Sequence, residues 1–201
     1  EVANGLSLVS DTGYLDADRR WQSADEYRFN AATGLIDRGL SLITHDHQVW
    51  NQRLHLSWDG MIGGHRNRLT IGGEVGETDF FTLRRFGASN GLDPFDPVRG
   101  TFPATSSPAF DTRQDVTADV KMVALFAEDA FNLTPEWLLV GGLRWDRIEL
   151  DRQVVNATSG AVQNYGQDYD PVTWRIGTVY SVRPKTQLYA QYTSAVTPLS
   201  G

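Results

Sequence analysis

Apolar and polar residues alternate most clearly between Trp137 and Trp145. One face carries Trp137, Leu139, Gly141, Leu143 and Trp145, and the other runs from Leu138 and Val140 through Gly142 to Arg144 and Asp146. A period of two predicts a β-strand whose two faces meet different surroundings. About nine residues tilted by about 45° rise roughly 21 Å, close to the roughly 25 Å apolar band of an outer-membrane barrel. The pattern therefore predicts a lipid-facing strand with a tryptophan at each interface.

A second segment repeats this spacing. Trp50, Gln52, Leu54, Leu56 and Trp58 share one face, opposite Val49, Asn51, Arg53, His55 and Ser57. Two tryptophans again bracket a stretch of the same length, which is typical of the aromatic girdles at the two membrane interfaces.

The other predicted strands are less regular. We expect strands near 6–27, near 69–75 after a tight Gly63-Gly64 turn, and in a last hairpin over 174–182 and 188–192. Residues 116–131 are apolar on both faces, so the pattern does not assign their orientation. Connections near 63, 133 and 184 are short and are predicted to be periplasmic. Those near 34, in 86–115 and in 156–168 are predicted to be longer extracellular loops.

About seven strands result, which predicts an all-β fold. It is an antiparallel, up-and-down transmembrane β-barrel fragment, with residues 1–201 forming part of one barrel domain. Bacterial barrels usually have an even number of strands, and seven would leave two unpaired edges. We therefore expect the chain to be part of a larger barrel.

Composition narrows the alternatives. The 201 residues are 40% hydrophobic with a formal charge of −7 and no cysteine. No apolar run is long enough for a transmembrane helix, and the absence of a basic cluster argues against nucleic acid as a partner. The chain starts at Glu1 without a visible targeting segment, so in an outer-membrane protein we expect the true N-terminus to lie upstream.

The order of several motifs resembles one family, the TonB-dependent siderophore receptors of the Gram-negative outer membrane. The strand-turn-strand signature lies in residues 126–137 and in the Gly142-Leu-Arg-Trp-Asp146 run. Glu128 stands where the family usually has Gln, and Trp145 where it often has Tyr. The resemblance extends to segments 27–30, 33–38, 93–97, 174–180, 188–192 and 197–201.

This resemblance implies a function. Such receptors are large barrels closed by an N-terminal plug, and they import ferric siderophores with energy relayed by the inner-membrane TonB complex. By this resemblance, the complete barrel is expected to have about 22 strands. The chain resembles the middle of the barrel, with the plug domain and the C-terminal barrel strands absent. The implied partners are a ferric siderophore, outer-membrane lipid and, through the plug, TonB. We expect no enzyme activity, no metal site and no cofactor other than the transported siderophore.

Candidate ligand contacts are aromatic residues at the outer ends of the strands. Siderophore receptors, by resemblance, hold cargo with aromatic side chains at that level, and rings offer large contact area at low entropic cost. The alternative is that these rings belong to a girdle or pack loops. The predicted ligand-binding residues are Trp21, Tyr27, Phe81 and Phe86, and the predicted structural motif residues are Gly142, Arg144 and Asp146.

Other chemistry is weakly indicated. His45 and His47 share a strand face and could bind a metal with a third ligand, although polar residues of a luminal wall are the favoured interpretation. Glycine pairs at 72–73 and 141–142 lie within strands and indicate bends or close packing. Two other classes stay open. One is another outer-membrane barrel: a porin, an adhesin, or a receptor for haem, cobalamin or a glycan. The other is a soluble all-β binding module or carbohydrate enzyme.

Overall fold

A computed structural model describes residues 5–196 and shows one antiparallel sheet. Residues 1–4 and the motif at 197–201 lie outside the described residues. Residues 5–196 contain no helix long and apolar enough to cross a membrane. The strands are β1 (Leu6–Asn30), β2 (Leu35–Ile62), β3 (His65–Leu92), β4 (Phe110–Asn132), β5 (Trp137–Asn156), β6 (Val162–Tyr169), β7 (Val172–Arg183) and β8 (Thr186–Thr193).

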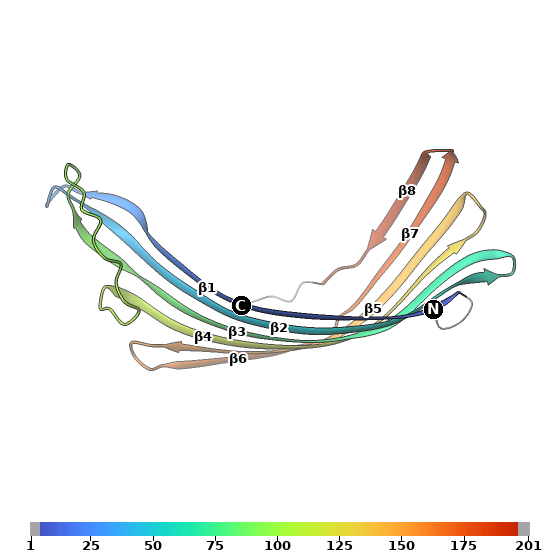
Figure 1. Ribbon diagram of the computed structural model, residues 1–201, viewed down its shortest axis with the longest axis horizontal. Coiled ribbons are helices and arrows are strands. Elements are labelled where there is room, and N and C mark those ends of the chain that lie inside the picture. The colour runs from blue at the N-terminus through green and yellow to red at the C-terminus, as the bar shows by residue number, and fades with distance from the viewer. Residues whose placement is uncertain (1–4, 197–201) are drawn as a thin grey trace.

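The sheet has an up-and-down order. Its strands follow one another as β1-β2-β3-β4-β5-β7-β8, and β6 pairs with β5. The sheet curls into an open trough, with β1 and β8 at its two free edges (Figure 1). The prediction of an all-β, up-and-down barrel fragment is confirmed.

β6 and β7 follow a single path along β5. β6 pairs with the outer part of β5, Ile148–Val155, and β7 with the remainder, Trp137–Trp145. Pro171 lies between them and cannot donate to the ladder, although its carbonyl still accepts the Asp146 N–H at 3.0 Å. The sheet therefore has seven strand positions, as predicted. The loop predicted over 156–168 is wrong, because most of it is β6.

The connections differ in length from the expectation. β1 and β2 pair up to Asn30 and Leu35, so only a four-residue turn with Gly34 at φ 72° separates them. The irregular part of the connection predicted over 86–115 shrinks to residues 93–109. The Gly63-Gly64 turn lies where predicted, with φ of 59° and 85°. Much of the chain that was predicted to form extracellular loops is instead part of the long strands.

Contacts that skip a strand identify the concave face. Arg144 on β5 reaches Glu74 on β3, and the Arg53 guanidinium on β2 lies 4.7 Å from the Phe126 ring centroid on β4. Side chains converge on the inside of a curved sheet and diverge on its outside. The face that carries Arg53, Glu74, Phe126 and Arg144 is therefore the concave, luminal one.

The convex face carries an apolar band. Directly paired residues form a row across six strands, namely Leu8, Leu56, Ile71, Ala127, Leu143 and Trp174. Leu143 is 56% exposed and Leu125 58% exposed, whereas Asp146 on the concave face is only 8% exposed. This inverts the usual soluble pattern and fits a surface covered by lipid. The register also settles the orientation of β4, whose Val123 and Leu125 point outward.

Beyond Trp50 the sheet continues on the side predicted to be extracellular. We call this part, which ends at the 31–34 turn and the 93–109 loop, the extracellular extension. Its small core consists of Leu40, Leu42 and Phe110, with Phe102 from the loop packed against it. Leu42 and Trp50 are eight residues apart on β2, and the pairing with β3 is regular between them, so Leu42 lies on the same convex face as Trp50. The loop is thus anchored outside the trough, and the concave face stays open.

Candidate functional site on the concave face

An ion network occupies the concave face behind the apolar band. Arg144 lies 3.0 Å from the Glu74 carboxylate and 2.7 Å from that of Asp146, and Arg53 lies 3.9 Å from Glu74. One guanidinium thus joins β3 to β5 across β4. Partly buried charges need such partners, because an unpaired one loses solvation without compensation. Arg144 and Asp146, two of the residues predicted to form a structural motif, thus lie in one ion network, and their structural role stays a prediction.

Two glycines make room for this network. A Cβ on Gly142 would lie 3.2 Å from Arg175 Cγ, because the Arg175 side chain crosses this position to pair with Glu128 on β4. A Cβ on Gly72 would lie 2.5 Å from the Phe126 ring, which carries the Arg53 guanidinium on its face. At both positions the absence of a side chain leaves space for a charged group of the concave face or for the ring beneath it.

Farther out, the concave face of the extracellular extension presents rings. Phe80 on β3 lies beside two imidazoles of β2, with centroid distances of 5.2 Å to His45 and 5.5 Å to His47. The strand alternation places Phe86 on the same face of β3 as Phe80. Trp21 pairs with Ile43, on the same face as His45, and its side chain is 60% exposed. Trp21, Phe80 and Phe86 thus share the concave face of the extension, and we call this set the aromatic wall.

The four predicted ligand residues do not form one surface. Trp21 and Phe86 lie on the concave face, but Phe81 shares a face with Asp79 and Val75 and therefore points outward. Tyr27 lies in a bulge between Asp25 and Arg28, outside the regular ladder. Phe80 was not among the predicted ligand residues, because Phe80 and Phe81 are both aromatic and only the strand register shows which of them faces the lumen.

Metal binding has no geometric support here. Within the described part of the chain, no group of three His, Cys, Asp or Glu side chains is arranged to hold a metal ion. His45 and His47 instead flank the Phe80 ring.

Charges on the convex side of the extracellular extension are mainly acidic. Partial burial, and then a hydrogen bond and repulsion from Asp79, raise the pKa of Asp119, which lies outside the apolar band. Seven carboxylates lie on this face, in the rows of paired residues that run from Asp16–Gln48 to Gln22–Leu42 on β1 and β2 and continue across β3 to β5. They belong to Asp16, Asp18, Asp46, Asp79, Asp115, Asp119 and Asp151.

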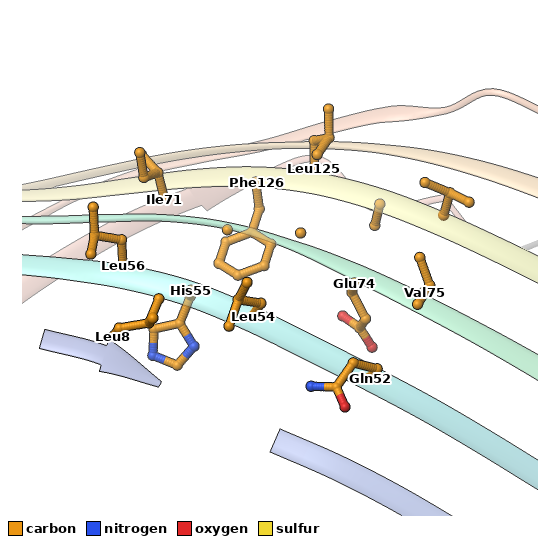
Figure 2. Close-up of a pocket in the computed structure, with 14 residues that line it drawn as sticks. Leu8, Gln52, Leu54, His55, Leu56, Ile71, Glu74, Val75, Leu125 and Phe126 are labelled. Carbon is orange, nitrogen blue, oxygen red and sulfur yellow. The ribbon is translucent and has the colours of Figure 1, made fainter. Parts of the chain in front are cut away.

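A depression of about 660 Å³ lies over the Gly72-Gly73 pair. Leu56, Ile71 and Leu125 lie on one side of the ribbons there, whereas His55, Glu74 and Phe126 point to the other (Figure 2). The hollow arises because Gly73 has no side chain among the exposed aliphatic residues of the band. We therefore assign it to the lipid-facing surface and not to a ligand site.

Together, the apolar convex band, the charged concave face and the up-and-down order define part of the wall of an outer-membrane β-barrel. The family model described as "TonB dependent receptor-like, beta-barrel" matches residues 3–201. The chain belongs to the TonB-dependent receptor family, whose barrels lie in the bacterial outer membrane. It is a family of receptors and not of enzymes.

Individual relatives agree. The chain is 24% identical to the probable TonB-dependent siderophore receptor PiuA of Acinetobacter baumannii, over 99% of this chain and 29% of that protein. The crystal structure of that organism's siderophore receptor PiuA matches with a TM-score of 0.73 at 20% identity, over 96% of this chain and 30% of the other. The crystal structure of the open form of the ferric-catecholate import receptor Fiu of E. coli K12 matches with a TM-score of 0.80 at 12% identity, over 98% of this chain and 34% of the other. The chain thus spans about a third of the length of these relatives.

Proposed function

We propose that this chain is part of the barrel wall of an outer-membrane receptor that takes up ferric siderophores. The observation that carries the proposal is the alignment of nearly the whole chain with a relative named as a siderophore receptor. The open concave face, with its rings and charges, provides a surface for a cargo inside the barrel. The lipid-facing band provides the anchor.

Within this proposal, the free edges of β1 and β8 pair with further strands of the same barrel. A plug domain closes the lumen and contacts the TonB complex. The concave network around Arg144 supports the wall, and the aromatic wall of the extracellular extension takes part in binding.

Uptake of radioactive iron tests the proposal. The full-length receptor containing this chain is expressed in an outer-membrane receptor deletion strain, with and without a functional TonB complex. We expect accumulation of iron from at least one siderophore of a catecholate, hydroxamate and carboxylate panel, and only when TonB is functional. Equal accumulation with and without the receptor across the whole panel would reject siderophore uptake, and growth on haem or cobalamin would then identify the other cargo class.

A further inference from the structure

The two faces of the extracellular extension differ in charge. The chain as a whole carries a formal charge of −7. On the concave side, we followed the rows of directly paired residues from the Leu15–Val49–Thr78 row to the Ser23–Ser41–Phe86 row. Among the described residues these rows contain no Asp or Glu, and the first carboxylate beyond them is that of Asp25 at the rim. The carboxylates at this level lie on the convex side.

The same concave rows carry three guanidinium groups. Arg19 pairs with His45, Arg84 with Ile43 and Gln114, and Arg152 with Ala118, which places one arginine on each of β1, β3 and β5. Within the part of the chain that the structure describes, no ion pair is formed by any of the three. Arg152 instead lies over the Tyr165 ring, 5.9 Å from its centroid. The other residues of these rows are neutral apart from His45 and His47.

This arrangement differs from the network behind the apolar band. There, Arg53, Arg144 and Arg175 are each matched by a carboxylate, so their charges are largely cancelled. In the extension these three positive charges face the lumen without a carboxylate partner among residues 5–196. The low-dielectric walls of the concave surface strengthen their field. Such a surface attracts an anion and repels a cation.

Resting on the proposed function, we infer that the cargo is an iron chelate of net negative charge, and that the luminal guanidiniums of Arg19, Arg84 and Arg152 attract and hold it. The rings of Trp21 and Phe80 border these arginines and supply flat contact area. Charge on the cargo is thus the property that this wall selects.

The test uses the full-length receptor in detergent and two hexadentate ferric chelates of similar size, a trianionic tris-catecholate and a neutral tris-hydroxamate. We expect tighter binding of the trianionic chelate and a fall in its affinity as salt is raised. Each of Arg19→Gln, Arg84→Gln and Arg152→Gln should weaken its binding roughly three- to tenfold, with a larger loss in the triple variant. Arg20→Gln changes the next residue of β1 on the convex face and should leave the affinity unchanged.

A second pair of variants adds charge instead of removing it. Thr78→Glu places a carboxylate on the concave face and should weaken trianionic binding, whereas Gln48→Glu on the convex face should not. Equal affinity for both chelates, or equal effects of Arg19→Gln and Arg20→Gln, would overturn the charge inference while leaving siderophore uptake in place. Failure of every chelate to deliver radioactive iron to cells would reject both.

Discussion

The apolar band and the extracellular extension are built from the same strands but solve different problems. In the band, one face must satisfy lipid, so most charged side chains lie on the concave side and are paired there, as Arg144 is with Glu74 and Asp146. In the extension both faces meet water. Hydrophobic alternation is lost, and the segregation of charge between the two faces takes its place. Strand pairing holds both regions together, while the surroundings decide their side chains.

The largest expected effect breaks the band. Leu54→Arg in the full-length receptor should cost about 2–4 kcal/mol, because it places a charge in the lipid near the midplane. Reversible unfolding in lipid vesicles measures this loss. Gln48→Arg on the same face of β2 but above Trp50, and Ser57→Arg on the concave face, are controls that should cost much less. Equal losses at all three positions would contradict the assignment of the faces.

The next effect concerns paired against exposed charges. Arg144→Met leaves Glu74 and the largely buried Asp146 without their cation, and should cost about 1–3 kcal/mol in the same unfolding measurement. Arg147→Met removes an exposed convex arginine that pairs with Glu149, and we expect little change. Similar losses in both variants would show that the concave network is not special.

An effect of about the same size tests close packing beneath the network. Gly72→Ala should cost about 1–3 kcal/mol, since its Cβ would enter the space of the Phe126 ring. Gly76→Ala is the matched control on the same face of β3, because its nearest neighbour would be 3.5 Å away. A stability gain in both variants would mean that the ring moves aside freely.

The smallest effect concerns the extension alone. Phe80→Ala should weaken cargo binding about three- to tenfold without loss of folded barrel, whereas Phe81→Ala should have little effect, because Phe81 faces outward. Titration of intrinsic fluorescence with the transported chelate measures both. A greater loss of affinity from Phe81→Ala would contradict the assignment of Phe80 to the ligand surface and would favour Phe81, the residue predicted from the sequence.

What the sequence could predict follows the same division. In the band, lipid demands an apolar residue at every second position, so β2 and β5 and their tryptophan spacing were predictable from residues alone. The extension is solvated on both faces, and its strands carry no such signal. The run of Gly, Asn and Gln near β6 therefore predicted a loop.

The pairing register also shows which way some side chains point where the pattern of apolar residues does not. β4 is apolar on both faces, and only its pairing with β3 and β5 shows that Leu125 points outward. Register likewise shows that Phe80, and not Phe81, faces the lumen. The contacts of Gly142 depend on Arg175, which is far away in the sequence but lies on the neighbouring strand β7. The charge difference between the faces likewise appears only when residues far apart in the chain are aligned in rows.

The claim that one face of β2 meets lipid, and only below Trp50, can be tested directly by a cysteine scan. The chain contains no cysteine, so spin labels introduced singly from 42 to 58 report on one position each in this segment. In lipid vesicles, we predict that accessibility to oxygen alternates with a period of two from 50 to 58, with maxima at 54 and 56, and that the oxygen maxima disappear from 42 to 49. Maxima at 53, 55 and 57, or an alternation that continues unchanged through 42, would contradict the account.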